Sequence, residues 1–299
     1  MPLTRRKQIS KKIKYRLNFK HNKNMTVKCK NSFTLMRWVF FESRLFWTGR
    51  ASRKDLANYF DISLERASAA ISDYIKIAPN NAHYDPSAKV YRATKDFKPI
   101  IISTSSEQVL GHLLLEDGFL DPMPVMARLP VPKRALPVDI LRPLLSCIAE
   151  GHSIDILYRS MSSSQPKWRM ITPHAFGHDG FRWHVRAYCS LRSSFRDFVL
   201  GRILETGVTK ESDTSAENDN AWNEKVTIII GPDKRLGESQ KAAIEMDFGM
   251  ENGEARFEVR RAMLFYVLKQ LCLHRDDLGA SPEEQQIRLV NSEIRDLLR

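Results

Sequence analysis

Arginines at alternating strand positions are the clearest chemistry-bearing residues of this 299-residue chain. Between Trp168 and Ile203 the sequence holds six arginines and three histidines against two acids, Asp179 and Asp197. The middle of this window alternates apolar and polar residues with the period of a β-strand. Its polar positions are Arg182, His184, Arg186 and Tyr188. Such a row makes either a solvated face or a site for anions.

We expect an anion or nucleotide pocket, because aromatic side chains interleave with arginines from three predicted strands, and stacking beside guanidinium groups suits bases and phosphates. The nearby acids Asp155, Asp179 and Asp197 are expected on the opposite face or in turns, as ion partners. The ligand residues predicted from the pattern are Tyr158, Arg169, His184, Arg186, Tyr188, Arg196 and Arg202.

No catalytic arrangement accompanies this row. The sequence has no glycine-rich phosphate loop, no CxxC pair and no HExxH motif. His174, His178 and His184 could in principle hold zinc, but arginines on the same face would repel a cation. We therefore predict no enzyme, no metal site and no cofactor.

The composition is that of an ordinary soluble globular protein, with 42% hydrophobic and 27% charged residues. No apolar run reaches the length of a membrane span, and the N-terminal residues lack the apolar core of a secretory signal. Cys29, Cys147, Cys189 and Cys272 lie far apart without metal-binding spacing. This cysteine pattern favours a reducing cytoplasm.

The positive charge is concentrated at the N-terminus. Residues 1–30 hold eleven of the 47 basic residues and no acid, so the remainder carries 36 basic against 35 acidic residues, or +1 of the total +12. A basic arm binds nucleic acid without sequence preference by displacing counterions. The alternatives are an arm with no specific role or an upstream extension, if translation starts at Met25.

A helix-turn-helix follows the arm. Apolar spacing predicts helices over 32–47, 53–60 and 64–77, with Ser52 capping the second. Ala57 is small enough for a close helix crossing, and Asp61 tolerates the left-handed turn where glycine is usual. A turn at 85–87 predicts a β-hairpin wing over 82–94. This wing favours a winged helix-turn-helix over a plain helical hairpin.

The third helix offers short polar side chains and an arginine for base edges and phosphates. Residues at the helix starts and in the wing are expected to hold phosphates. The predicted DNA-binding residues are Ser52, Arg53, Lys54, Ser63, Arg66, Ser68, Ser72 and Lys89.

The rest of the chain divides into four segments. Thr104 and Glu107 predict a capped helix to Glu116, residues 121–137 predict a proline-rich connector, and Pro143 is expected near the start of a helix that Gly151 ends. An acidic stretch over 211–220 predicts a linker, and the strands and helices after it alternate β-α-β-α-β. The predicted boundaries are a basic arm (1–30), the winged helix-turn-helix (31–94), a connector (95–150), a barrel (151–210), a linker (211–221) and a C-terminal domain (222–299).

Several spaced pieces of the barrel carry a family resemblance. Tyr158-Arg159-Ser160, residues 169–173, Trp183-His184-Val185 and residues 195–203 resemble a WYL domain, the small Sm-like barrel of bacterial transcription regulators. Trp183-His184-Val185 stands in the place of the Trp-Tyr-Leu that names the family. The implied fold class is α+β and multidomain, with a winged helix-turn-helix, a Sm-like β-barrel and a small α/β C-terminal dimerisation domain.

The resemblance also implies a function. Ser160 and His174 would complete the ligand site, the C-terminal domain would form a homodimer, and the effector would be single-stranded DNA or a cyclic nucleotide. The chain is similar to WYL repressors encoded beside phage-defence operons, such as those of BREX and cyclic-oligonucleotide systems. The leading hypothesis is a repressor that binds an inverted repeat of double-stranded DNA and is released by the effector.

Two other hypotheses stay open. One is an accessory protein of a defence or DNA-repair system whose barrel binds single-stranded nucleic acid, and the weaker one is an enzyme acting on nucleotides. Under the leading hypothesis, replacing Arg186 by alanine is expected to spare DNA binding and abolish the response. The operator, the effector and the sign of regulation are not specified by the sequence.

Overall fold

The computed structural model describes residues 32–102, 104–114, 125–127, 132, 134–212, 214–275 and 279–298, with only the backbone for 112–114. It forms two compact units, Met1–Pro130 and Val131–Arg299, and each is described by itself. The basic arm, the predicted helix end at Glu116 and much of the proline-rich stretch lie outside the described residues. No helix in the described part is long and apolar enough to cross a membrane.

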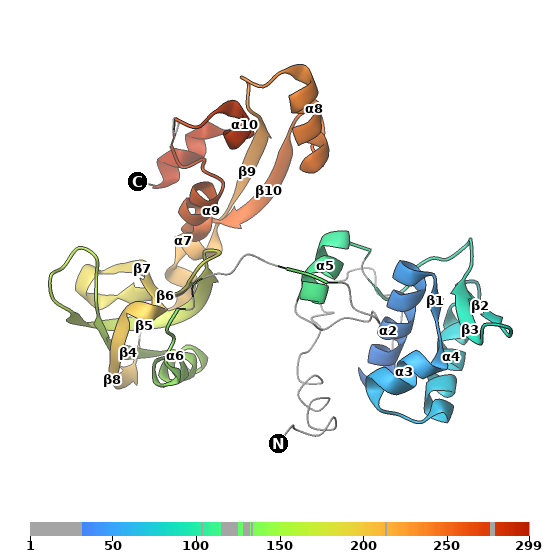
Figure 1. Cartoon of the computed structure of the whole chain (residues 1–299). Helices are drawn as coiled ribbons and strands as arrows, with labels where there is room; N and C mark the ends of the chain where they lie inside the picture. Colours follow the sequence, from blue (N-terminus) through green and yellow to red (C-terminus); the bar gives the residue numbers. More distant parts are fainter. Residues whose placement is uncertain are drawn as a thin grey trace. The chain divides into compact units, whose positions relative to one another are not determined.

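The first unit is a winged helix-turn-helix (Figure 1). Its elements are α2 (Ser32–Thr48), β1 (Arg50–Ala51), α3 (Arg53–Phe60), α4 (Leu64–Ile77), β2 (Ala82–Asp85), β3 (Val90–Ala93) and α5 (Ser106–Leu114). The three predicted helices and the predicted hairpin are confirmed. The strand β1 was not predicted, because two residues carry no periodicity; it pairs with β3 to give the sheet order β1-β3-β2.

Local signals set the boundaries of these helices. Ser52 and Asp55 form a reciprocal capping box at the start of α3, and Asp61 ends α3 in the left-handed region with φ 51° and ψ 53°. Both outcomes confirm the predictions. At α5 the hydroxyl of Ser105 accepts from the Gln108 amide, so the predicted capping role of Thr104 is wrong by one residue.

The core of the first unit lies where α2 crosses α3 and α4. Its largest buried side chains include Phe41, Leu45, Leu56, Ile71 and Tyr74. Burying an aliphatic or aromatic side chain contributes roughly 1.5–3 kcal/mol, so this cluster holds the three helices as one body.

The second unit begins with α6 (Val138–Glu150) against a five-stranded antiparallel sheet of order β7-β6-β5-β4-β8. The strands are β4 (His152–Tyr158), β5 (Lys167–His178), β6 (Trp183–Cys189), β7 (Ser194–Val199) and β8 (Ile203–Glu211). Short 3-10 turns, η2 (Ser190–Arg192) and η3 (Leu200–Arg202), flank β7. Ile140 and Leu144 of α6 pack on the sheet core with Ile154 and Ile156.

Three predictions for this region need correction. Pro143 lies inside α6 and not near its start, since the helix begins five residues earlier. The last barrel strand, β8, ends at Glu211, one residue beyond the predicted end of the barrel. The supposed linker also forms η4 (Ala216–Asn218) and α7 (Asn220–Asn223), and its Asp219 is 1% exposed. Polar composition suggested a solvated segment, but the polar groups bond to the barrel.

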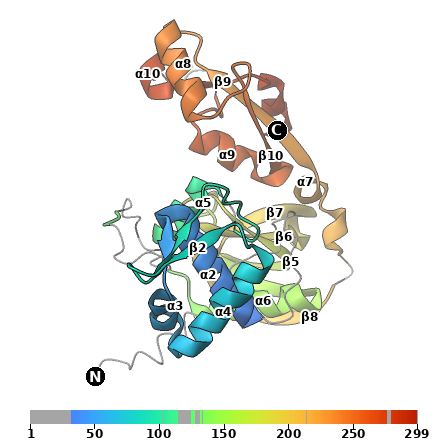
Figure 2. The same cartoon turned by 90° about the vertical axis from the view of Figure 1, so that its right-hand side faces the viewer.

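The C-terminal region is an antiparallel sheet of order β10-β9-β11 with helices around it. Its elements are β9 (Lys225–Pro232), α8 (Glu238–Asp247), β10 (Ala255–Arg260), η5 (Arg261–Met263), α9 (Leu264–Gln270), α10 (Pro282–Gln285), β11 (Ile287–Leu289) and η6 (Ser292–Leu298). The predicted β-α-β-α-β order is confirmed. Both views show α7 between the barrel and this sheet (Figures 1 and 2), and Leu264 and Leu268 of α9 pack on Ile228 and Ile230.

Candidate nucleic-acid interface and effector face

The third helix, α4, presents one solvent-facing stripe. Ala67, Ala70, Ile71 and Tyr74 are buried against α2 and α3, which leaves the opposite side of the helix exposed. The exposed residues of that side are Glu65, Arg66, Ala69, Ser72, Asp73 and Lys76, and Lys76 Nζ pairs with Asp73 Oδ1 at 2.8 Å. A helix with a short, polar outward stripe and one free arginine suits the major groove of DNA.

The predicted DNA-binding residues fall into two groups. Ser52 and Ser63 use their hydroxyl oxygens to accept the amides of Asp55 and Arg66, so their first role is to start α3 and α4. The remaining residues of the set, apart from half-buried Ser68, are exposed. These are Arg53 and Lys54 in the first turn of α3, Arg66 and Ser72 on α4, and Lys89 at the wing turn.

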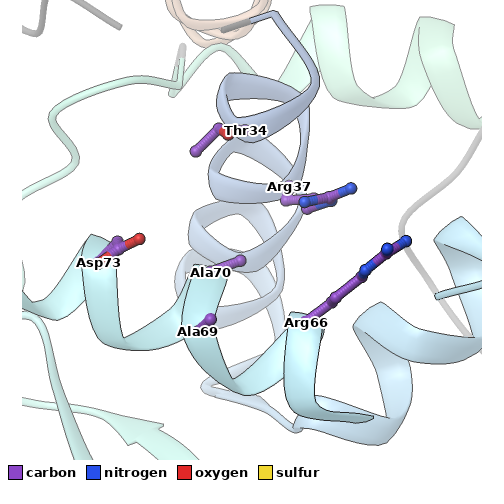
Figure 3. A pocket seen from close by; sticks show the side chains of 6 residues that line it. All are labelled: Thr34, Arg37, Arg66, Ala69, Ala70 and Asp73. Atoms are coloured by element: carbon purple, nitrogen blue, oxygen red, sulfur yellow. The ribbon is translucent and has the colours of Figure 1, made fainter. Parts of the chain in front are cut away.

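A second arginine stands beside Arg66. Arg37 of α2 and Arg66 of α4 line an open cleft of about 320 Å³, and both side chains extend toward the same side of it, whereas Asp73 lies at the other end (Figure 3). Among the described residues neither guanidinium has a carboxylate partner. Two unpaired guanidinium groups at the edge of a recognition helix suit a backbone phosphate. Sequence reasoning missed Arg37 because it treated α2 only as a core helix.

Glu42 joins α2 to α4 and to the segment that leaves the winged helix. It is fully buried, and its carboxylate accepts four hydrogen bonds of 2.8 Å: from the Tyr74 hydroxyl and from the amides of Ile100, Ile101 and Ile102. Buried carboxylates are stable only with such partners. Glu42 therefore fixes the exit path of the chain relative to the recognition helix.

In the second unit the strand register separates the predicted ligand residues onto two faces of the sheet. Arg186 lies opposite Asp197, whereas Arg196 lies opposite Ala187 in the core. Directly opposed residues of antiparallel strands share a face. The prediction that these arginines share one face, with Asp197 on the other, is wrong. The register shifts at Pro173–Ala175, and turns connect the strands, so alternation counted along the sequence does not assign side chains on different strands to the correct face.

The face that carries His184, Arg186 and Tyr188, here called the Arg186 face, is covered by the chain itself. Asp219 forms a bidentate salt bridge with Arg186, in which Arg186 Nε donates to Asp219 Oδ2 at 2.7 Å and Nη2 donates to Oδ1 at 3.0 Å. Arg186 Nη1 donates to Asp197 Oδ1 at 3.2 Å, and the Tyr266 hydroxyl donates to Asp197 Oδ2 at 3.1 Å. Arg186 is only 7% exposed, so the predicted open arginine pocket is in this state filled by the protein's own carboxylates.

His174 is the fifth member of this network. Its Nε2 lies 2.9 Å from Asp219 Oδ2, and its ring packs edge-on against Phe195 and Trp222. Burial lowers the pKa of His174 and the bond to Asp219 only partly opposes this, so the ring is neutral near pH 7 and donates Nε2–H. Burial alone would raise the pKa of Asp219, but the ion pair with Arg186 holds it below its usual value.

A third carboxylate, Asp179, lies on the same face nearer the 178–182 turn. Asp179 Oδ2 accepts from Arg182 Nε at 2.9 Å and contacts His184 Nε2 at 3.0 Å. Burial alone would raise the pKa of Asp179, but the bonds from His184 and from the Phe181 and Arg182 amides lower it well below its usual value. The ring of Tyr266 lies 4.8 Å from that of His184, so α9 reaches this cluster too.

The remaining predicted ligand residues lie elsewhere. Arg169 shares the core face with Ile156, and its guanidinium lies 5.9 Å from the Tyr158 ring centroid. The Tyr158 hydroxyl accepts the Val199 amide, Ser160 bonds with Ser162, and exposed Arg196 contacts Ser194. The side chain of Arg202, in η3, is half-buried. The structure thus brings together His174, His184, Arg186 and Tyr188, and leaves the other five apart from them.

Sequence reasoning missed Asp219, Trp222 and Tyr266. Asp219 was hidden in a stretch that resembles a linker, and Tyr266 in a helix of the next domain. The local sequence gives one signal for Asp219: it is a helix-capping residue type directly before Asn220, and it caps α7 by accepting the Trp222 amide. Among the described residues, no three His, Cys, Asp or Glu side chains gather as metal ligands.

Comparison with known proteins agrees with this architecture. Residues 34–114 match the BrxR transcriptional regulator winged helix-turn-helix domain, residues 139–208 the WYL domain, and residues 225–294 the BrxR transcriptional regulator C-terminal dimerization domain. The fold and its sites therefore define a WYL-type transcriptional regulator.

Relatives that match the chain across all three domains identify the family within this class. The chain is 40% identical over 272 residues to the DNA-binding transcriptional repressor CapW of Pseudomonas aeruginosa, covering 88% of this chain and 91% of the relative. It is 38% identical to CapW of Escherichia coli and 35% identical to CapW of Stenotrophomonas maltophilia, each covering 86% of this chain and 89% of the relative. The protein belongs to the CapW family of transcriptional repressors.

The similarity to a solved structure, proteasome accessory factor B/C, is weak. Proteasome accessory factor B/C of Arthrobacter aurescens is 14% identical, with a TM-score of 0.27, and the match covers 90% of this chain and 46% of that chain. This likeness is too slight to add to the argument.

Proposed function

We propose that the protein represses transcription as a homodimer that binds an inverted repeat of double-stranded DNA and is released by a nucleic-acid-derived anion at the Arg186 face. Its family and its winged helix support the DNA-binding part. The exposed stripe of α4 reads base edges, while Arg37, Arg53 and Lys89 hold phosphates. The C-terminal region supplies the dimer contact.

The observation that supports effector binding at the Arg186 face is the bidentate salt bridge between Arg186 and Asp219. A carboxylate held by a guanidinium fork occupies the place that a phosphate oxygen would take, since both anions match the same donor geometry. Asp219 lies in the segment between the barrel and the C-terminal sheet. An incoming phosphate that displaces Asp219 therefore frees this segment and changes how the dimerisation region sits on the barrel.

The effector acts only through its unequal affinity for the two states. In the closed state Asp219 competes with it, whereas in the released state Arg186 is available. The equilibrium between these states sets the fraction of dimer able to bind DNA. Weakening the Asp219 contact without any effector must shift the equilibrium in the same direction.

This mechanism is tested with Asp219→Asn. The variant keeps the size of the side chain and removes its charge, so we expect weaker binding to DNA from the protein's own promoter in the absence of effector. Fluorescence anisotropy at physiological salt measures the DNA affinity, with and without a short single-stranded oligonucleotide or a cyclic nucleotide. The wild type should lose affinity only when the effector is added.

The matched control is Asp179→Asn, which removes a carboxylate from the same sheet face. The two partners of Asp179, Arg182 and His184, both belong to the barrel. It should bind DNA as the wild type does and still respond. If Asp219→Asn binds DNA as tightly as the wild type and responds to the same effector concentration, the displacement mechanism is wrong. Loss of DNA binding in both variants would indicate general destabilisation.

A further inference from the structure

The C-terminal sheet has an open edge at strand β10. In the order β10-β9-β11, β10 pairs with β9 on one side, and no described strand pairs with it on the other (Figure 1). An open edge presents unpaired N–H and C=O groups, to which another strand can hydrogen-bond. The region matches a C-terminal dimerization domain, but that match does not identify the surface that forms the contact.

The hydrogen-bond directions identify the residues of β10 that face this edge. The strand pairs with β9 in an unbroken antiparallel register over Ala255–Arg260. One residue further, the Arg261 amide donates to the Glu224 carbonyl, on the β9 side, at 2.9 Å. Backbone groups of successive residues in an antiparallel strand point alternately to its two sides. The residues whose backbone groups point to the open edge are therefore Arg256, Glu258 and Arg260.

A tight turn closes one end of the edge. Glu251 and Glu254 exchange two backbone hydrogen bonds of 2.9 and 3.1 Å, so the turn uses the backbone groups of Glu254. The open part of the edge is short, and it is centred on Phe257. A strand of this length selects its partner by side-chain matching as well as by backbone pairing.

The side chains along the open edge alternate in charge. Arg256, Glu258 and Arg260 are exposed. Within the chain Arg256 pairs with Glu254 and Glu258 pairs with Lys225, but the Arg256 and Glu258 side chains are still 64% and 59% exposed. Ion pairs this exposed contribute little. A row of a single charge would repel a second copy, whereas an alternating row can match itself.

One self-pairing register matches both the backbone and the charges. An antiparallel pair of β10 strands with a twofold axis at Phe257 places Arg256 of each copy opposite Glu258 of the other, and both residues direct their backbone groups to that edge. An axis at Arg256 would oppose two arginines, and an axis at Glu258 would oppose two glutamates. An axis nearer either end of the strand leaves half of the edge unpaired.

Phe257 occupies the axis of this register. Its side chain lies on the same face as buried Ile228, which it opposes in β9, and it is 37% exposed. Its backbone groups bond to β9, so the two copies of Phe257 would form a pair without mutual hydrogen bonds. Side chains in such pairs approach most closely. The exposed part of each ring would then be covered by the other ring.

We propose that two copies of the chain dimerise by antiparallel pairing of their β10 strands about a twofold axis at Phe257. The pairing joins the two C-terminal sheets into one continuous sheet, with Arg256–Glu258 ion pairs on one face and the Phe257 pair on the other. The inference rests on the homodimer of the proposed function and names the surface that forms it.

Charge reversal tests the register. Arg256→Glu or Glu258→Arg alone places like charges opposite each other in both symmetric pairs, so the dimer should dissociate about tenfold or more readily. The double variant Arg256→Glu/Glu258→Arg restores opposite charges between copies and should recover the wild-type dimer. Within one chain it places like charges beside Glu254 and Lys225, so local pairs would predict further loss. Sedimentation velocity of the full chain over a concentration series at physiological salt measures the dimer.

The matched control is Glu238→Arg, which reverses a charge that is 92% exposed on α8 of the same region. It should dimerise as the wild type does. Glu258→Arg and Glu238→Arg make the same chemical change, so a difference between them reports the position and not the net charge.

A disulfide tests the axis independently. With Cys29 and Cys272 replaced by serine, Phe257→Cys places two thiols opposite each other, at a Cα separation of about 4.5 Å that a disulfide can span. Mild oxidation should give a covalent dimer on a non-reducing gel. Arg256→Cys in the same background should not, because its two copies lie two positions apart along the paired strands. The charge variants change exposed residues, so they test the pairing even if Phe257→Cys folds poorly.

A wild-type dimer that neither single charge reversal weakens would overturn the pairing and leave the homodimer standing. So would a double variant that dimerises less than both single variants, or a disulfide that forms equally in Arg256→Cys and Phe257→Cys. A wild type that stays monomeric over the whole concentration series would contradict the homodimer of the proposed function as well. The two failures are therefore distinguished in one experiment.

Discussion

Arg186 and Arg196 follow the same alternating sequence pattern, but their side chains lie in opposite environments. Arg186 is buried between two carboxylates, and Arg196 is exposed beside Ser194. Burying a guanidinium costs hydration free energy, which its two carboxylate partners offset, and these carboxylates in turn depend on the cation. The expectation that Arg186→Ala spares DNA binding and abolishes only the response did not include this loss of stability.

Arg186→Ala should destabilise the second unit by about 3–5 kcal/mol, because it leaves Asp197 and Asp219 buried without their cation. Arg196→Ala, the matched control on the other face, should change the stability by no more than about 0.5 kcal/mol. Urea unfolding of the full chain followed by circular dichroism measures both. Equal, small effects would contradict the observed burial of the Arg186 network.

His174 gives this network a dependence on pH. Its folded pKa is lowered, so between that value and about 6.5, the usual pKa of histidine, the unfolded chain binds more protons than the folded chain. Stability should therefore fall as the pH drops through this window. The Asp219 pKa is also lowered, but that contribution is lost only near pH 4 and below.

The measurement is the thermal midpoint between pH 7.5 and pH 5.5 for the wild type, His174→Gln and His178→Gln. The glutamine at position 174 can still donate to Asp219, and it does not titrate, so the midpoint should fall less with acidification. His178 is exposed, and its variant should follow the wild type. A His174→Gln profile as steep as that of the wild type would show that this ring is not a source of the dependence.

At the scale of elements, local chemistry predicted the winged helix well. Ser52, Asp61 and the 85–87 turn are short-range signals, and the helices and the wing begin and end where these residues indicate. The five-stranded sheet was predicted in outline only. Its bulges and the 3-10 turns around β7 interrupt the two-residue alternation from which side-chain faces are assigned. Long-range partners, such as Glu42 with Ile100–Ile102 or Asp219 with Arg186, leave no local periodicity and could not be predicted.

Glu42 supplies an element-scale prediction. In Glu42→Gln an amide nitrogen replaces one acceptor oxygen and faces backbone N–H donors, which costs about 1–3 kcal/mol. Amide hydrogen exchange at Ile100, Ile101 and Ile102 should accelerate by about tenfold or more, since these bonds open locally. Glu107→Gln, an exposed change on α5, should leave these rates as they are. Unchanged exchange in Glu42→Gln would show that other contacts hold the exit segment.

At the scale of the whole molecule, the DNA-binding residues and the Arg186 face belong to different units. The proposed regulation therefore requires that the junction of barrel and C-terminal region alter how two copies present their α4 helices. Asp219 lies in that junction and Arg186 in the barrel, so in the proposed mechanism the displacement of Asp219 is the step that connects effector binding with the dimer arrangement.

Arg37 provides a test of the DNA-binding surface of the assembled molecule. If Arg37 holds a phosphate, Arg37→Gln should weaken binding to specific and unrelated DNA alike and reduce the salt dependence, the slope of log affinity against log salt, by about 1. Lys225→Gln removes the same charge from the C-terminal region and should leave the slope as in the wild type. A normal slope in Arg37→Gln would place the cleft outside the interface.

The most direct test of operator recognition is a gel shift on the DNA upstream of the protein's own gene, with competitor DNA at physiological salt, for the wild type and Arg66→Ala. Recognition through α4 predicts a discrete complex that resists competitor and that Arg66→Ala weakens by about 1–3 kcal/mol. A smear that disappears as salt rises, equal in both proteins, would contradict it. Binding would then be the non-specific attraction of basic residues, and a single-strand-binding role would replace operator recognition.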